Sequence, residues 1–171
     1  MKTLMIFGKD SEIITEKSDR DSLEFRDNKV FITYEKAPEN LLKDFLAELL
    51  YTQVCEIYEE IRKEGKIDIF GNLDFEIVEK IDGKNQRIAK LKGNKIFIKL
   101  NAVALPKGAL KYIIAHEIAH TLTKKHTKKF WKIVEAIYPG FREGERDFME
   151  YGKVVVEFAD NYKILFPHRE E

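Results

Sequence analysis

The longest regular pattern of apolar residues in the chain follows Pro38. Apolar side chains recur there at intervals of three and four residues, which is the spacing that places them on one face of an α-helix. The set comprises Leu41, Leu42, Phe45, Leu46, Leu49, Leu50, Val54, Ile57, Tyr58 and Ile61. Proline is favoured at the first position of a helix, and a glycine follows the last apolar residue. The pattern therefore predicts a helix from Pro38 to near Gly65.

Shorter stretches rich in β-branched and aromatic residues predict strands. Turn dipeptides separate most of them, because Asn, Asp and Gly tolerate a positive φ and therefore favour hairpins. These dipeptides are Asp27-Asn28, Asp82-Gly83 and Gly93-Asn94. The strands predicted on either side of them are Ser22–Arg26, Lys29–Tyr34, Asp74–Ile81, Arg87–Lys92 and Lys95–Leu100.

The second half of the chain is predominantly helical in pattern. One helix is predicted to begin at Pro106, and Thr127 is predicted to cap another that runs to Tyr138. Pro139-Gly140 stops that helix, and a last helical stretch covers about Glu143–Leu165. Because strands come early and helices late, the chain is predicted to be an α+β protein with a small, mostly antiparallel sheet packed against the helices.

Composition supports one globular domain over residues 1–171. Of the 171 residues, 44% are apolar and 35% are charged, which is typical of a folded protein and not of a disordered one. No stretch approaches 18 uninterrupted apolar residues, so no membrane span is expected. The N-terminal residues do not read as a signal peptide, and Cys55 has no partner for an internal disulfide. We therefore expect a cytoplasmic protein.

Three of the four histidines fall within eleven consecutive positions, in the run HEIAHTLTKKH. On a helix, His116 and His120 lie on one face and can direct both imidazoles at one ion. Zinc is the leading candidate because it accepts neutral imidazole nitrogens. Glu117 lies about 100° round the helix, so it need not bind the metal and can act as the general base on the water that the metal activates. This arrangement predicts a zinc-dependent hydrolase.

The apolar flanks of the HEIAH run strengthen that interpretation. Residues 113–115, 118, 119 and 122 make the helix apolar on nearly every side, which indicates a buried helix. Two histidines and a glutamate inside such a helix would be costly without partners, and a metal supplies one. The opposing interpretation is a chance match to a five-residue pattern in which the histidines are hydrogen-bonded core residues.

Two candidates compete for the third metal ligand. His126 stands just before Thr127, and a chain that turns back there would return its imidazole to the metal. The glycine and the Met-turn of metzincins are both absent, and Thr123 stands at the glycine position. The rival is an acid of VEFAD, Glu157 or Asp160, on the last predicted helix. We favour His126.

The sequence from about Lys92 to Phe141 carries a family resemblance. It contains a strand ending in Leu-Asn, a proline a few residues later, the HEIAH helix, a third histidine followed by threonine, then Phe130-Trp131 and a proline-containing turn. With these features the chain resembles the YgjP-like metal-dependent hydrolases, which are close to the WLM and SprT-like metalloproteases. VFITYEKAPENLLKDF extends the likeness upstream, whereas the WGSC-like stretch of the family is replaced here by RIAKLKGN.

The resemblance implies a minimal zincin-like metallopeptidase fold and a peptide or protein substrate. Carried over residue by residue, it implies zinc ligands at His116, His120 and His126 and a catalytic glutamate at Glu117. The WLM and SprT-like relatives act on proteins bound to DNA, so the resemblance also implies a nucleic-acid context.

Several other residues near the HEIAH motif are assigned roles from the chemistry of their side chains. Phe130 and Trp131 are interpreted as core aromatics. An oxyanion donor could be any one of Tyr112, Tyr138 and Tyr151, and Asp147 and Glu150 are candidates to orient the histidines.

Charge is unevenly distributed although the net charge is zero. Residues from Lys84 to Lys132 include thirteen Lys and Arg but only one acid, Glu117, which gives a local charge of +12. A solvated face is the plain interpretation of such a run. The alternatives are a surface for nucleic acid, a hydrolase of a phosphate-containing substrate, or a nucleic-acid-binding module stabilised by zinc.

Overall fold

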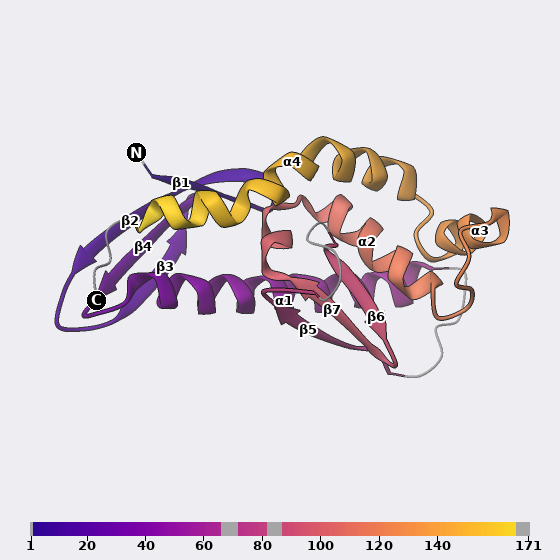
Figure 1. Cartoon of the computed structure of the whole chain (residues 1–171), viewed down its shortest axis with the longest axis horizontal. Helices are drawn as coiled ribbons and strands as arrows, with labels where there is room; N and C mark the ends of the chain where they lie inside the picture. The colour runs from indigo at the N-terminus through magenta and orange to yellow at the C-terminus, as the bar shows by residue number, and fades with distance from the viewer. Residues whose placement is uncertain (1, 66–71, 82–86, 167–171) are drawn as a thin grey trace.

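The computed structural model describes residues 2–65, 72–81 and 87–166 (Figure 1). It is an α+β protein, as predicted, in which the strands form two small mixed sheets instead of one. The strands are β1 (Thr3–Ile6), β2 (Lys9–Lys17), β3 (Ser22–Arg26), β4 (Lys29–Tyr34), β5 (Asp74–Val78), β6 (Ala89–Lys92) and β7 (Lys95–Lys99). The helices are α1 (Pro38–Glu64), the 3-10 helix η1 (Leu100–Ala104), α2 (Lys107–Ala119), α3 (Lys128–Ile137) and α4 (Phe141–Leu165).

The first sheet has the order β1-β2-β4-β3. Its β3–β4 hairpin has the predicted bounds, and the predicted turn residues Asp27 and Asn28 adopt φ values of 53° and 58°. Pairing within this sheet is antiparallel except between β2 and β4, which are parallel because β3 lies outside β4 instead of between them. Strands β1 and β2 are absent from the sequence prediction. They meet at Phe7-Gly8, where both φ values are positive, and this is not one of the dipeptides that signal a hairpin.

The second sheet has the order β5-β7-β6. The β6–β7 hairpin turns at Gly93-Asn94 as predicted, and Lys92 pairs with Lys95. Strand β5 pairs in parallel with β7, so the predicted hairpin between β5 and β6 is wrong. Its proposed turn, Asp82-Gly83, lies outside the described residues. Strand β6 is therefore at one edge of this sheet and pairs on one side only.

Helix α1 runs along both sheets, with the first at its N-terminal half and the second at its C-terminal half (Figure 1). Its N-terminal half packs on the first sheet through an edge-on contact between Phe45 and Phe25, at 5.7 Å between ring centroids. Its C-terminal half packs on the second sheet through Tyr58 and Phe75, at 5.4 Å. The apolar spacing of α1 predicted its buried face, and six residues of that face are fully buried: Leu42, Leu46, Leu50, Val54, Ile57 and Ile61.

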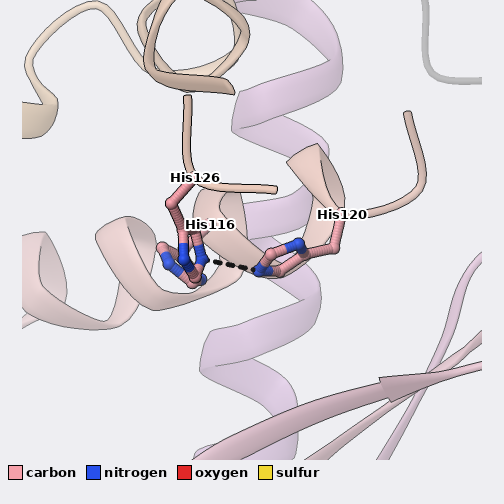
Figure 2. A group of neighbouring side chains, drawn as sticks. All are labelled: His116, His120 and His126. Atoms are coloured by element: carbon pink, nitrogen blue, oxygen red, sulfur yellow. Dashed lines mark hydrogen bonds between the residues drawn. The ribbon is translucent and has the colours of Figure 1, made fainter. Parts of the chain in front are cut away.

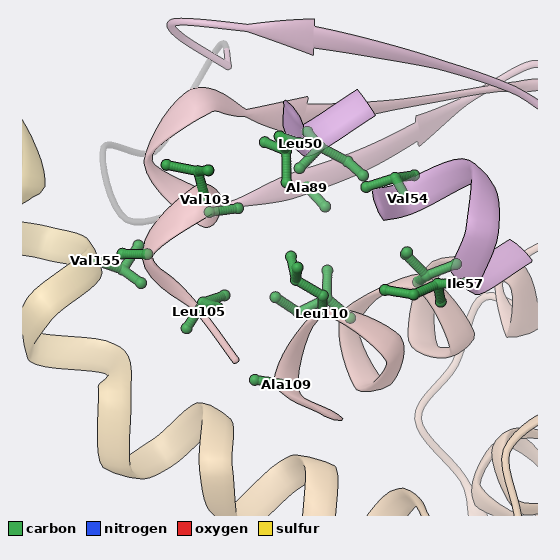
Figure 3. Close-up of a cluster of buried hydrophobic side chains, with 14 of the residues drawn as sticks. Leu50, Val54, Ile57, Ala89, Val103, Leu105, Ala109, Leu110 and Val155 are labelled. Atoms are coloured by element: carbon green, nitrogen blue, oxygen red, sulfur yellow. The ribbon is translucent and has the colours of Figure 1, made fainter. Parts of the chain in front are cut away.

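The core continues from α1 into the helices that follow (Figure 3). Leu50, Val54 and Ile57 face Leu110 of α2, and Val103 and Leu105 join them to Val155 of α4. The amide of Asn101, part of the Leu-Asn pair noted in the sequence, donates a hydrogen bond to the Val155 carbonyl at 3.2 Å. Within the described residues, no helix combines the length and the apolar character that crossing a bilayer requires.

Candidate metal centre

Helix α2 carries the first two histidines of the cluster. His116 lies in its last turn, and the helix ends at Ala119, so His120 occupies the C-cap position with helical φ and ψ. The predicted burial of this helix is confirmed, because nine of its thirteen residues are buried, including the catalytic candidate Glu117 at 6% exposure. The two imidazoles lie side by side, with ring centroids 4.9 Å apart.

The chain turns back after α2 and brings the third histidine to the first two (Figure 2). The amide of Thr123 donates a hydrogen bond to the Ala119 carbonyl, and α3 begins at Lys128. His126 Nε2 lies 3.1 Å from His120 Nε2. Thr127 is the N-cap residue of α3, as predicted, but its side chain makes no capping hydrogen bond.

The donor set formed by the three histidines fits a single metal ion. One ligand atom from each of His116, His120 and His126 lies within 4.8 Å of the other two. Ligand nitrogens at about 2.0–2.1 Å from a tetrahedral ion lie roughly 3.3 Å apart. The 3.1 Å between His120 Nε2 and His126 Nε2 is already close to that spacing.

Hydrogen bonds favour the tautomers that metal binding needs. His120 Nδ1 lies 3.2 Å from the Thr123 carbonyl oxygen, and His116 Nδ1 lies 3.2 Å from Glu117 Oε2. A carbonyl and a carboxylate only accept, so a proton on Nδ1 satisfies both contacts, and in that tautomer the Nε2 of each ring is the atom that can bind a metal. Burial, and then the neighbouring His116, lower the pKa of His120 below its usual value, which favours the neutral ring that a metal requires.

Two aromatic residues at the start of α3 support the histidines. Phe130 is fully buried, and its ring centroid lies 5.0, 4.8 and 4.7 Å from those of His116, His120 and His126. Phe130 is therefore a core residue, as predicted, and its position also keeps the three imidazoles together. Trp131 is only half-buried and stacks on His126 with 6.3 Å between centroids. Sequence reasoning assigned it to the core and missed its place beside the cluster.

The buried Glu117 carboxylate is held between α2 and strand β6. Its Oε1 accepts a hydrogen bond from the Leu91 amide at 3.0 Å. Because Lys92 and Lys95 close a two-residue hairpin, the Leu91 amide points away from β7 and towards the histidines. The unpaired edge of β6 therefore fixes the carboxylate next to the cluster. No side-chain pattern in the sequence signals this backbone contact.

The structure does not bring the rival ligands to the histidines. Glu157 is exposed and lies 3.9 Å from Lys153 on the same helix. It lines a cavity of about 380 Å³ between α4 and β1, to which Lys2 and Asp10 also contribute. This part of α4 is at the opposite end of the molecule from α3 (Figure 1). Asp160 is exposed one turn further along the same helix.

Of the three tyrosines considered as oxyanion donors, Tyr112 lies closest to the cluster. Its ring centroid is 6.1 Å from that of His116, and its hydroxyl donates to Glu145 Oε2 at 3.1 Å. Burial, reinforced by that hydrogen bond, raises the pKa of Tyr112, so it remains a neutral donor. Tyr138 lies beneath Lys111 at the other end of α2, and Tyr151 packs against the core.

The carboxylates predicted to orient the histidines do not do so. Asp147 lies next to Gly108 at the beginning of α2, about two turns before His116. Glu150 is exposed on α4. Instead, the Thr123 carbonyl contacts His120 and the Glu117 carboxylate contacts His116. Neither group is an acidic residue that follows the HEIAH motif in the sequence.

A close contact between two glycines fixes α4 against α2. A Cβ atom on Gly144 would lie 2.5 Å from the Gly108 carbonyl oxygen and 3.0 Å from the Tyr112 Cβ. Only glycine allows this approach, because real Cβ atoms do not come so near a backbone oxygen. The contact sets the position of Glu145, the next residue of α4, against the Tyr112 hydroxyl.

Eight lysines of the basic segment fall into two groups. Lys95, Lys107 and Lys111 pair with acids of β5 and α1, at 3.2 Å to Glu76, 2.6 Å to Glu60 and 3.2 Å to Glu64. The lysines that flank His126 are exposed, and they form no ion pair with any residue that the structure describes. This second group, called the α3 lysines below, comprises Lys124, Lys125, Lys128, Lys129 and Lys132. Lys84 and His168 lie outside the described residues.

Comparison with known proteins gives one match. The model of the YgjP-like family, described as YgjP-like, metallopeptidase domain, matches residues 1–151 of the chain. No curated protein and no solved structure matches it. The match includes both sheets, α1, α2, α3 and the first part of α4, and therefore the whole histidine cluster. The chain belongs to the YgjP-like family of metallopeptidase domains.

Proposed function

We propose that the protein is a zinc-dependent peptidase whose metal is held by His116, His120 and His126. The observation that carries this proposal is the convergence of three imidazole ligand atoms within 4.8 Å beside one buried carboxylate. Zinc suits a set of three neutral imidazoles and leaves a fourth position open to solvent or substrate. When bound, zinc supplies a Lewis acid that lowers the pKa of water and polarises a carbonyl group.

Glu117 is the residue assigned to proton transfer. Its Oε1 is held by the Leu91 amide and its Oε2 lies 3.2 Å from His116 Nδ1, so both contacts fix the carboxylate beside the histidines, where it can reach a water molecule bound there. It accepts the proton of the attacking water and delivers it to the leaving amine. Tyr112, beside His116, is the candidate oxyanion donor, and its one hydroxyl hydrogen would have to leave Glu145 Oε2 to reach the developing oxyanion.

Strand β6 offers the surface along which a peptide can lie. It is an edge strand, and the side that does not pair with β7 faces Glu117. An extended peptide binds such an edge through main-chain hydrogen bonds, which here must use groups of β6 other than the Leu91 amide, because that amide already donates to Glu117. A peptide bond aligned on β6 would thus come within reach of both Glu117 and the histidines.

Zinc analysis and peptide cleavage together test the proposal. Purified protein should contain about one zinc per chain and cut a mixed peptide library at defined bonds. Removing the metal with a chelator should abolish cleavage, and adding zinc back should restore it. Zinc-loaded protein that leaves every member of the library intact would contradict the peptidase assignment.

The α3 lysines favour one second candidate, a hydrolase of a phosphate-containing substrate. Their positive charge lies beside the same cluster and attracts phosphate oxygens. Release of phosphate or pyrophosphate from nucleotides, with the peptide library untouched, would favour this function. Loss of that release in Glu117→Gln would assign it to the same site.

A further inference from the structure

A groove opens next to the histidine cluster, between α3 and the beginning of α4. It has a volume of about 440 Å³. Its α3 side is formed by side chains three and four residues apart, which share one face of the helix. Its lining consists of Lys128, Trp131, Lys132, Glu135, Phe141, Arg142 and Glu145.

Trp131 joins this groove to the cluster. Its ring centroid lies 6.0 Å from that of His116 and 6.3 Å from that of His126. On the other side it stacks on Phe141, at 6.1 Å and an interplanar angle of 22°. Anything that binds against Trp131 in the groove therefore lies one aromatic ring away from the histidines.

The groove carries more positive charge than its surroundings neutralise. Three cations line it, against two carboxylates, and one of these, Glu145, already accepts a hydrogen bond from the Tyr112 hydroxyl. Lys128 and Lys132 belong to the α3 lysines, which form no ion pair within the described part of the chain. A bound zinc ion would add two further positive charges beside them.

The position of these lysines on α3 is unfavourable for the helix itself. Lys128 and Lys129 occupy its first turn, where the helix dipole is positive and acidic residues are preferred. No acid stands in that turn, and Thr127 does not cap it. A charge arrangement that weakens its own helix is expected where function requires it, and an anion bound there would relieve the repulsion.

We propose that this groove is a specificity subsite that binds an acidic side chain of the substrate, Asp or Glu, next to the bond to be cut. The proposal rests on the peptidase function proposed above and names its substrate class. A single carboxylate fits the lining, because it can meet Lys128 or Lys132 while its methylene groups lie on Trp131 and Phe141. A polyanion such as nucleic acid fits less well, because its further charges would extend to Glu135 and Glu145, whereas a single carboxylate can meet one lysine away from them.

Trp131 provides a direct measurement, because it is the only tryptophan in the chain. Its fluorescence is followed in Glu117→Gln protein while a short acidic peptide is added, so that binding is seen without turnover. The same peptide with Gln and Asn in place of Glu and Asp is the neutral comparison. We expect the acidic peptide to bind at least about fivefold more tightly, with an advantage that falls as salt is added.

Two double variants locate the effect. Lys128→Ala with Lys132→Ala should abolish the preference for the acidic peptide. Lys153→Ala with Lys163→Ala removes the same charge from the far half of α4 and should leave the preference intact. An equal loss of the acidic preference in both double variants would overturn the subsite. Equal binding of the acidic and neutral peptides to the Glu117→Gln protein would overturn it as well.

Further ligands and a separate assay complete the test. A single-stranded oligonucleotide or inorganic phosphate that changes Trp131 fluorescence at lower concentration than the acidic peptide would overturn the assignment to an acidic side chain. Peptide hydrolysis is measured apart from binding. Absence of cleavage with the acidic preference present would refute the peptidase function while supporting the subsite.

Discussion

The paired and the unpaired lysines of the basic segment come from one continuous stretch of sequence but lie in different surroundings. Lys107 and Lys111, at the beginning of α2, meet Glu60 and Glu64 of α1. The α3 lysines, at the other end of the same stretch, meet no acid among the described residues. A local charge of +12 in the sequence therefore becomes a neutralised face and a positive face.

This difference shows how tertiary structure divides a charge run. The acids that neutralise the first group are more than forty residues away in the sequence and are brought close by the packing of α1 on α2. No such helix lies over the loop that carries His126. Positive charge remains where the histidines and the groove are found.

The largest effect is expected at Glu117, the one acid within the basic segment. Glu117→Gln should lower kcat by about 10²–10⁴-fold, because the amide cannot accept a proton from water. Its oxygen can still accept the Leu91 amide hydrogen, so zinc content and circular dichroism should not change. Glu157→Gln, on the far part of α4, is the matched control and should keep full activity. Unchanged kcat in Glu117→Gln would refute the general-base role.

Zinc affinity tests whether the loop of the α3 lysines belongs to the metal centre. His126→Ala should weaken zinc binding about as much as His116→Ala, and by more than the roughly 10–100-fold that losing an outer partner of a ligand costs. The measurement is a competition titration with a zinc-binding dye. If His126→Ala retains full affinity while Glu157→Ala loses it, the third ligand is the glutamate and the loop is only a linker.

Stability measurements compare the two lysine groups directly. Lys111 is 12% exposed, pairs with two acids and lies 4.8 Å from the Tyr138 ring centroid. Lys111→Ala should therefore lower the free energy of unfolding by about 1 kcal/mol. Lys128→Ala removes a cation from the first turn of α3, where the helix dipole disfavours positive charge. It should leave the free energy of unfolding unchanged or raise it by about 0.3 kcal/mol. Urea unfolding of the two variants measures these changes. A similar loss of unfolding free energy in both variants would contradict the difference between the two lysine groups.

The smallest effect is a pH dependence at Glu60. The hydrogen bond from Lys107, with the charges of Lys107 and Lys111, lowers the pKa of Glu60 below its usual value. A carboxyl whose folded pKa is lowered stabilises the protein above its unfolded pKa, and that contribution is lost as pH falls through the folded pKa. The stability difference between wild type and Glu60→Gln should be about 0.2–1 kcal/mol near pH 7 and vanish near pH 3. A difference that grows on acidification would contradict the pairing.

The sequence predicted those parts of the fold that depend on local signals. Helix α1 follows from its apolar spacing, and the β3–β4 and β6–β7 turns follow from residues that accept positive φ. The buried position of α2 and the approach of His126 to His120 also follow from nearby residues. Each of these predictions used information within about one element of the residue concerned.

The remaining features depend on contacts between distant segments. The parallel pairing of β5 with β7 follows no turn signal, and the Phe7-Gly8 turn lacks the usual residues. The hydrogen bond to Glu117 comes from the backbone amide of Leu91, so the pattern of side chains does not predict it. The neutralisation of Lys111 depends on where α1 ends relative to α2.

Helix α1 also has a consequence for how the protein loses its structure. Its 27 residues span about 40 Å, and one row of buried side chains serves the first sheet at one end and the second sheet at the other. Neither sheet can separate from the helix without exposing part of that row to water. Opening therefore spreads along the helix from either end, and the backbone amides near Leu46 and near Ile57 should exchange with solvent at similar rates, as members of one cooperative unit.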